Sequence, residues 1–377
     1  MSDEHNVMPA ATRDGGLAEN GGSSGSTGES LQAQAGSTVT LHYGTNRNMI
    51  GDHDEFGPEF GWAPNDRNYY AGIAQFAPTR SLDDAIAGRP AAGGAAITGV
   101  KVDPQKMIES FLDEASRVQA ASTDPGLQSL VYIHGYAFEF KEVAPIARVV
   151  AAGYGSKANL FFSWPSYGSH WRYGDDWDHA YGSGTAAAQF LLDLLAGVAK
   201  MAVPPRLSLV CHSMGNRVLS STIQALDVQT QTKLTRFFDH ILLFAADESY
   251  TAIDDARKLQ PALAMFKKSM TIYTNQFDVP LQLAKDHPKN KSEELGRKGP
   301  ATFPILDSSG AVRKDVFWVD CSEVADNLKS TLGHQYYRVV PAVIQDAAAV
   351  LSGAAGATIP GRKPDAAVAQ KFLIPKP

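Results

Sequence analysis

The sequence predicts an α/β fold with a mostly parallel central sheet and helices on both faces. Short apolar runs typical of buried strands recur along the chain, and stretches with helical spacing of apolar residues lie between them. Strands that alternate with helices form mostly parallel sheets that are covered on both sides. With 377 residues and 44% hydrophobic residues, the chain can build one large domain of this kind.

The elements follow from these patterns in chain order. Residues 38–43 are predicted to form a first strand, and residues 97–102 a strand near the sheet edge. Runs typical of buried strands then follow at 129–133, 159–163, 207–210, 238–245, 270–274 and 316–320. Helices are predicted where apolar residues recur every three to four positions, at 106–119, 182–202 and 341–351, and directly after residue 215.

The ends of the chain differ in composition from its middle. Residues 1–37 are rich in Gly, Ser, Glu and Asn, so we expect a disordered N-terminal arm. Residues 38–355 are expected to form the α/β domain, and residues 356–377 a tail that packs only locally. The N-terminus lacks the pattern of a signal peptide and no apolar run reaches membrane-spanning length, so a cytoplasmic location is the default expectation.

Charge and cysteine content narrow the classes of partner. The net charge is -6 and there is no basic stripe, so we expect no nucleic-acid partner. The two cysteines, Cys211 and Cys321, lie far apart near predicted strands. We expect both to be buried free thiols rather than a disulfide.

The segment around Ser213 says most about function. An apolar strand at 207–210 leads into Cys-His-Ser-Met-Gly, and an amphipathic helix follows. A serine on such a sharp strand-to-helix turn is lifted out of the sheet with its hydroxyl exposed, and small residues must flank it. The usual pattern is Gly-x-Ser-x-Gly; here Cys211 replaces the first glycine and Gly215 keeps the second.

A nucleophilic serine needs a histidine base and an acid behind that histidine. In this fold class the acid and then the histidine follow the serine in the chain, which leaves His240, His287 and His334. His240 enters a strand at the wrong end of the sheet, and His287 lies in a charged loop at 285–290 that looks solvated. His334 follows the last predicted strand, and we therefore predict that it is the base.

Two acids end neighbouring strands and could orient the histidine. Asp278 follows the strand at 270–274, and Asp247 follows the strand before it. We favour Asp278, because the acid usually comes from the strand that precedes the histidine-bearing strand. Asp247 is the alternative; its other interpretation is a helix cap or a brace for a nearby loop.

The predicted oxyanion hole uses two main-chain N–H groups. One belongs to Met214, which follows the nucleophile, and the other to Tyr136, in the loop after the strand at 129–133. His134 precedes Ser213 in the chain and is expected to support this loop rather than act as the base.

Three motifs together carry a family resemblance. They are Ile-His-Gly-Tyr at 133–136, Phe-Phe-Ser-Trp-Pro-Ser at 161–166 and His-Ser-Met-Gly-Asn-Arg at 212–217. With Tyr-Gly-Thr-Asn-Arg at 43–47, this ordered set resembles the α/β-hydrolase family of unknown function over roughly residues 38–350. The resemblance implies the α/β-hydrolase fold and a Ser213–Asp278–His334 triad, and it supplies no settled substrate.

These observations favour a serine hydrolase that cleaves an ester or similar acyl bond of a small molecule. No cofactor is required, and the His and Asp residues at 170–179 lack a recognised metal-ligand spacing. The aromatic segment 163–173 is either a pocket wall or a packed loop. A catalytically silent α/β-hydrolase that serves as a binding or scaffolding module is the alternative, because fold does not fix function.

Overall fold

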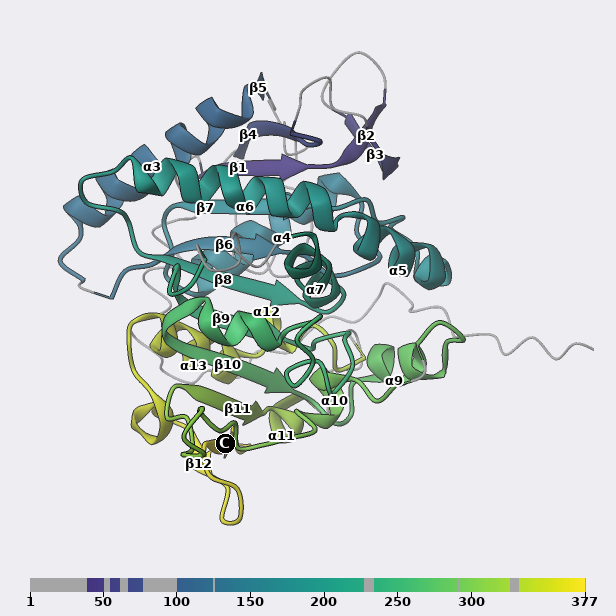
Figure 1. The fold of residues 1–377 in the computed structure, drawn as a ribbon, viewed down its shortest axis with the longest axis vertical. Coiled ribbons are helices and arrows are strands. Elements are labelled where there is room, and N and C mark those ends of the chain that lie inside the picture. Colours follow the sequence, from purple (N-terminus) through teal and green to yellow (C-terminus); the bar gives the residue numbers. More distant parts are fainter. Residues whose placement is uncertain are drawn as a thin grey trace, which may run out of the picture.

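A single large sheet organises the molecule. The computed structural model describes residues 39–50, 55–61, 67–76, 100–124, 126–226, 234–290, 292–325 and 332–376. The expected N-terminal arm at 1–37 lies outside these residues. In the described part, the sheet has 11 strands in the order β12-β13-β11-β10-β9-β8-β6-β7-β1-β4-β5 (Figure 1).

The strands from β13 to β1 in that order are all parallel to their neighbours, and β4, β5 and β12 are antiparallel additions at the two edges. The parallel strands are β1 (Val39–Thr45), β6 (Ser129–Ile133), β7 (Asn159–Ser163), β8 (Leu207–His212), β9 (Phe238–Phe244), β10 (Phe266–Thr274), β11 (Val316–Asp320) and β13 (Lys371–Leu373). The edge strands are β4 (Tyr70–Phe76), β5 (Val100–Val102) and β12 (Lys363–Pro364). A separate hairpin pairs β2 (Arg47–Ile50) with β3 (Glu55–Phe60).

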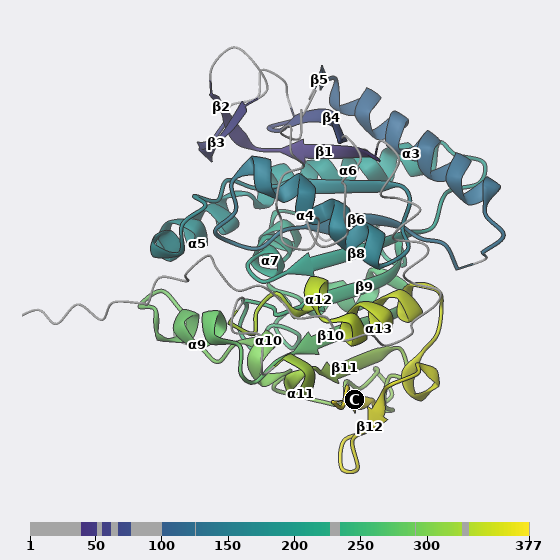
Figure 2. The ribbon, with the colours of Figure 1, turned by 180° about the vertical axis from the view of Figure 1, so that it is seen from behind.

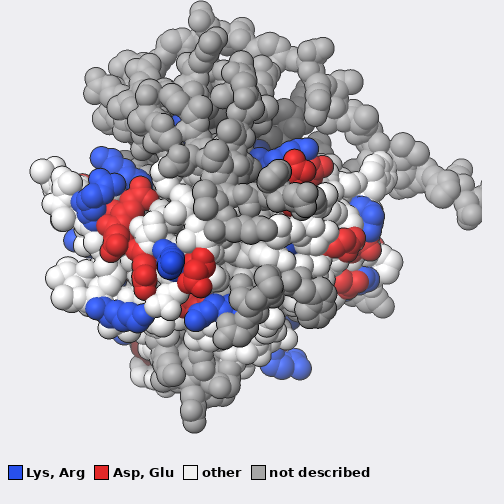
Figure 3. Space-filling view, turned by 90° about the horizontal axis from the view of Figure 1, so that it is seen from above, with Lys and Arg blue, Asp and Glu red and all other residues white. Residues whose placement is uncertain are grey.

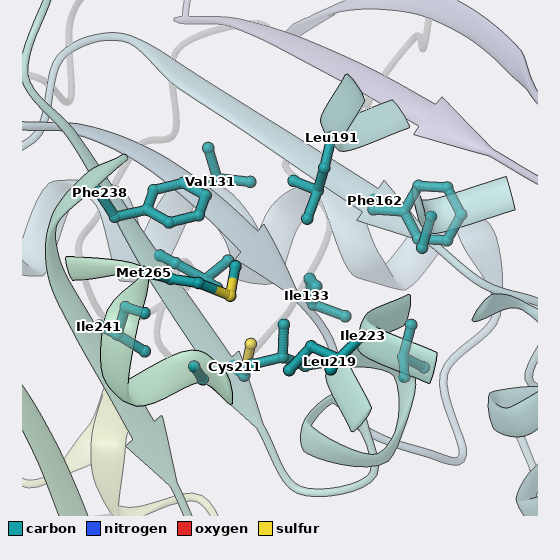
Figure 4. Packing of buried hydrophobic residues seen from close by; sticks show 14 of the residues in the cluster. Val131, Ile133, Phe162, Leu191, Cys211, Leu219, Ile223, Phe238, Ile241 and Met265 are labelled. Atoms are coloured by element: carbon teal, nitrogen blue, oxygen red, sulfur yellow. The ribbon is translucent and has the colours of Figure 1, made fainter. Parts of the chain in front are cut away.

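Helices cover both faces of the sheet, as the sequence predicts. One face carries α3 (Pro104–Ala121), α6 (Gly184–Ala199) and α7 (Gly215–Ala225), and the other carries α4 (Phe140–Gly153), α12 (Tyr336–Val339) and α13 (Pro341–Leu351) (Figures 1 and 2). Each face has its own buried apolar cluster. In the first cluster, Leu191 of α6 and Leu219 of α7 pack over the sheet residues Val131 and Ile241 (Figure 4).

The C-terminal segment corrects one expectation. Residues 356–377 do not pack only locally, because β13 pairs in parallel with β11 and β12 pairs with β13. Phe372 is buried in this pairing. The segment is short and carries few apolar residues, so its sequence gives only a weak strand pattern.

Three smaller expectations concern cysteines, membrane spans and surface charge. Cys211 and Cys321 are both buried free thiols, as predicted. No helix in the described ranges is long and apolar enough to cross a membrane. On the face seen in Figure 3, basic and acidic side chains lie next to one another in the described part of the surface.

Candidate active site

Ser213 occupies a strained turn between β8 and α7. Its φ is 53°, in the left-handed region that a non-glycine residue adopts at a cost. Its N–H donates to the carbonyl of Phe244 at the end of β9, at 2.9 Å, and its own carbonyl accepts from the Asp247 N–H at 3.1 Å. The turn is therefore fastened to the end of the neighbouring strand, which is the geometry the motif predicts.

Backbone atoms lie so close to this turn that only small residues fit around it. A Cβ on Gly215 would lie 2.5 Å from the carbonyl oxygen of Ile133 and 2.6 Å from that of His134, so a side chain does not fit there. Cys211, which stands in place of the usual first glycine, lies in β8 with its thiol buried in the apolar core (Figure 4). The core accommodates this one extra side chain, and the turn forms without the first glycine.

The exposure of the Ser213 hydroxyl was predicted wrongly. The Ser213 side chain is 0% exposed, and its Oγ has no hydrogen-bond partner in the described part of the chain. One reason is the close packing of the loop after β6. A Cβ on Gly135 would lie 2.9 Å from the Ser213 Cβ, so this glycine rests directly against the serine.

His334 and Asp278 form a buried pair. His334 Nδ1 lies 2.7 Å from Asp278 Oδ2, and both side chains are buried. Asp278 Oδ1 also accepts the Leu281 N–H at 3.0 Å, because Asp278 caps helix α9 (Val279–Asp286). Burial raises the pKa of Asp278, and the neighbouring His334 opposes this shift. His334 Nε2 has no hydrogen-bond partner among the described residues.

Asp247, the alternative acid, is engaged elsewhere. Its Oδ1 accepts from an Arg217 guanidinium N–H and from the Tyr173 hydroxyl, each at 2.9 Å. Burial disfavours the charged form of Arg217, but the nearby Asp247 and Glu248 carboxylates more than offset this effect, and the pKa of Arg217 is raised. Asp247 thus fastens the elbow helix α7 to α5 (Tyr173–Gly182), and the histidine faces Asp278 instead.

The charged loop at 285–290 was expected to be solvated, and this is wrong in part, because this loop and the residues that follow it include buried positions. Glu294 and Asn290 are buried and hydrogen-bonded to each other. Burial and the nearby Asp247 raise the pKa of Glu294 well above its ordinary range. His287 is half-buried and its ring packs on Tyr173, with centroids 5.0 Å apart. His240 is buried in β9 and bonds Ser269 at 2.8 Å, far from the carboxyl end of that strand.

The segment carrying His334 is held by two residues that sequence reasoning missed as site residues. His212, next to Ser213, lies with its Nε2 3.3 Å from the His334 carbonyl oxygen, and the two rings have centroids 4.8 Å apart. Asn275 donates its side-chain N–H to the Gly333 carbonyl at 2.7 Å. Burial lowers the pKa of His212 well below its usual range, so this ring stays neutral. His212 is next to Ser213 in the chain and Asn275 is three residues before Asp278, and this closeness was the signal that could have identified both as site residues.

The two main-chain amides predicted for the oxyanion hole have no acceptor within the described ranges. No described residue accepts a hydrogen bond from the N–H of Tyr136 or of Met214. Met214 directly precedes α7, so the positive end of that helix dipole faces the same region. The Tyr136 ring packs edge-on against Tyr173, and its hydroxyl lies 3.3 Å from His170 Nδ1.

The loop that carries Tyr136 is braced by two buried charges. Asp176 accepts the Ala137 N–H at 3.0 Å and the Ser166 hydroxyl at 2.6 Å. Arg47 donates to the carbonyls of Phe138 at 2.8 Å and Ser166 at 2.9 Å. Both charged side chains are fully buried. This brace ties the loop after β6 to the loop after β7.

His134 supports the same loop, as expected. Its ring stacks on Trp164 with centroids 5.2 Å apart, and its carbonyl accepts the Trp164 indole N–H at 2.8 Å. Its Nδ1 lies 2.6 Å from the Gly135 carbonyl. Burial lowers its pKa well below the usual value, so His134 is a neutral structural group.

The His and Asp residues at 170–179 serve protein contacts. Asp175 pairs with Arg172, Asp178 pairs with Lys289, and His179 Nδ1 lies 3.0 Å from the Pro165 carbonyl. Within the described ranges, no group of three or more His, Cys, Asp or Glu side chains could hold a metal ion.

Comparisons with known proteins identify the family. The family model described as "Alpha/beta hydrolase of unknown function (DUF900)" matches residues 113–352, which include Ser213, Asp278 and His334. The chain belongs to this family. Together with the mostly parallel sheet, the match establishes the α/β-hydrolase fold that the sequence predicts.

No curated protein matches this α/β-hydrolase significantly. Among solved structures, it is similar to a Trichoderma reesei cutinase in complex with a C11Y4 phosphonate inhibitor, at 17% sequence identity and a TM-score of 0.22. That match covers 38% of this chain and 64% of the cutinase chain, so it spans less than two thirds of the cutinase.

Proposed function

We propose that this protein is a serine hydrolase that cleaves an ester or a related acyl bond. The observation that carries the proposal is the buried His334–Asp278 pair, with a free Nε2, on a segment that His212 fastens beside Ser213. A histidine held by an acid on one nitrogen and free on the other is equipped to move a proton to and from a nucleophile.

The proposed reaction has two steps. Ser213 Oγ attacks the acyl carbon while His334 Nε2 takes the hydroxyl proton, and the same nitrogen then gives that proton to the departing alcohol. Water attacks the acyl-enzyme next, passes its proton to His334, and the proton returns to Ser213 as the acid leaves. Asp278 holds the imidazole in its tautomer and stabilises the imidazolium.

The tetrahedral intermediates carry a negative oxygen. The N–H groups of Tyr136 and Met214 are the proposed donors. They are supported by the N-terminus of α7 and by the lack of any acceptor for these N–H groups among the described residues. Each such donor contributes about 10²–10³ in turnover in enzymes of this kind.

The test is hydrolysis of p-nitrophenyl acetate and butyrate. We expect steady release of p-nitrophenol by the wild-type chain, and a loss on the order of 10⁶ in turnover on Ser213→Ala or His334→Ala if the two act as one unit. Full turnover in either variant would contradict the proposal.

One observation favours a second candidate, a catalytically silent binding module. The Ser213 side chain is wholly buried and no described group bonds its hydroxyl, so substrate reaches it only after neighbouring side chains shift. A binding module predicts no turnover of any ester and no reaction of Ser213 with an acylating or phosphonylating reagent.

A further inference from the structure

Large apolar side chains are exposed on the two segments that carry Asp278 and His334. Phe277, which directly precedes Asp278, is 53% exposed, and Leu332, two residues before His334, is 45% exposed. Val279 and Leu283 of α9 are also exposed. Single exposed apolar residues are ordinary, but a contiguous group of them marks a binding surface.

The main-chain segments that carry these four side chains lie next to one another. The Val279 N–H donates to the Leu332 carbonyl at 3.1 Å, and a Cβ on Gly333 would lie 3.2 Å from the Phe277 carbonyl oxygen. Leu283 follows Val279 by one helical turn in α9. We call Phe277, Val279, Leu283 and Leu332 the apolar rim.

Leu332 has a strained backbone in addition to an exposed side chain. Its φ is 51°, in the left-handed region, and Gly333 follows at 72°. A leucine in this conformation costs free energy, and so does its exposure to water. Residues with such strained backbones cluster at active sites and ligand-binding segments. Leu332 lies beside the proposed base, so a substrate bound there would contact its side chain.

A further exposed aromatic residue lies in the segment that leads into α5. Trp171 is 69% exposed. Its neighbour His170 contacts the hydroxyl of Tyr136, the residue whose main-chain N–H is a proposed oxyanion donor. Figure 1 shows α5, just after Trp171, and α9, which carries part of the apolar rim, both beyond the carboxyl ends of the strands. Exposed apolar side chains are therefore found near both helices at this end of the sheet.

We propose that the apolar rim binds the aliphatic chain of the substrate's acyl group, so that medium-chain and long-chain esters are preferred to acetyl esters. The proposal rests on the proposed function and adds the substrate class. Each methylene that leaves water for an apolar surface strengthens binding by up to about fourfold.

The test compares p-nitrophenyl acetate with p-nitrophenyl octanoate. We expect kcat/KM for the octanoate to exceed that for the acetate by at least about tenfold in the wild-type chain, since several methylenes contact the rim. In Phe277→Ser and in Leu332→Asn the octanoate-to-acetate ratio should fall about tenfold, and because it is a ratio, a general loss of activity leaves it unchanged. Asparagine tolerates the left-handed conformation, so Leu332→Asn removes the apolar contact without adding strain.

Val203→Ser is the matched control, because Val203 is 73% exposed and precedes β8 at the amino ends of the strands. Its octanoate-to-acetate ratio should equal that of the wild type. An unchanged ratio in both rim variants, or a wild-type chain with no preference for octanoate, would overturn the apolar rim while leaving the hydrolase proposal intact.

A binding measurement separates the two proposals. Calorimetry of decanoate with the Ser213→Ala variant needs no turnover, and we expect binding that weakens about tenfold when Phe277→Ser is added. Absence of decanoate binding overturns the rim whatever Ser213 does. Binding without any ester hydrolysis by the wild-type chain would instead contradict the proposed function alone.

Discussion

His334 Nδ1 lies 2.7 Å from Asp278 Oδ2, while Asp247, at the end of the neighbouring strand, is held by Arg217 and Tyr173. The two candidate acids therefore have separate contacts. Replacing Asp278 by Asn should lower kcat by about 10⁴-fold, because the imidazole loses its tautomer and its counter-charge. Asp247→Asn should lower kcat by no more than about tenfold, since it disturbs a brace rather than the base. Measuring kcat for ester hydrolysis in both variants decides which carboxylate orients His334. A larger loss of kcat in Asp247→Asn than in Asp278→Asn would make Asp247 the acid.

The brace of the Tyr136 loop gives a second prediction. Asp176→Ala removes the acceptor of the Ala137 N–H and should lower kcat by about 10²-fold with KM within about threefold, because a small displacement of an oxyanion donor is costly. Ser166→Ala is a milder variant of the same brace. The control is Asp346→Ala, which breaks another buried pair with Arg362 and should reduce stability but not kcat. Equal kcat losses in Asp176→Ala and the control would mean that the brace has no special relation to the site.

Gly215 gives a third prediction, on the elbow itself. Gly215→Ala should destabilise the protein by about 1–3 kcal/mol or more, because the new Cβ meets the carbonyl oxygens of Ile133, the last residue of β6, and of His134. Gly153→Ala, at the end of α4, meets only one side-chain methyl at 3.0 Å and should change stability by less than about 1 kcal/mol. Urea unfolding of both variants measures this, and similar stability would show that the elbow tolerates a side chain.

Two buried histidines outside the site predict how stability depends on pH. Burial lowers the pKa of His42 and of His240 from 6.5 to about 4. Between these values the unfolded chain binds more protons than the folded one, so the stabilisation present above pH 6.5 is lost as pH falls toward 4, by roughly 3 kcal/mol for each histidine. His240→Asn, which keeps an amide near Ser269, should flatten the fall in unfolding free energy over this range. A slope equal to that of the wild type would contradict the assignment.

Much of this arrangement could be predicted from the sequence, because it depends on local patterns. The runs at 129–133, 159–163 and 316–320 match β6, β7 and β11 residue for residue, since each contains a short continuous apolar run typical of a largely buried parallel strand. Asp278 and His334 also follow from position, because the carboxyl ends of parallel strands meet at one edge.

The features that could not be predicted from the sequence depend on contacts between residues far apart in the chain. The burial of Ser213 follows from the approach of Gly135, and the burial of Glu294 from its contact with Asn290 inside a stretch that is otherwise charged. Strand β13 is only three residues long and exists because β11 offers it a free edge. Arg47 and Asp176 are polar in the sequence, and only the fold shows that they are fully buried around the Tyr136 loop.

The central claim is that Ser213 is a nucleophile activated by His334. The most direct measurement is mass spectrometry of peptides from the intact protein after treatment with a small alkyl fluorophosphonate. We predict one phosphonyl group, on Ser213, formed at a rate that falls by several orders of magnitude in His334→Ala and absent in Ser213→Ala. Failure of the folded wild-type chain to react at Ser213 would contradict the account.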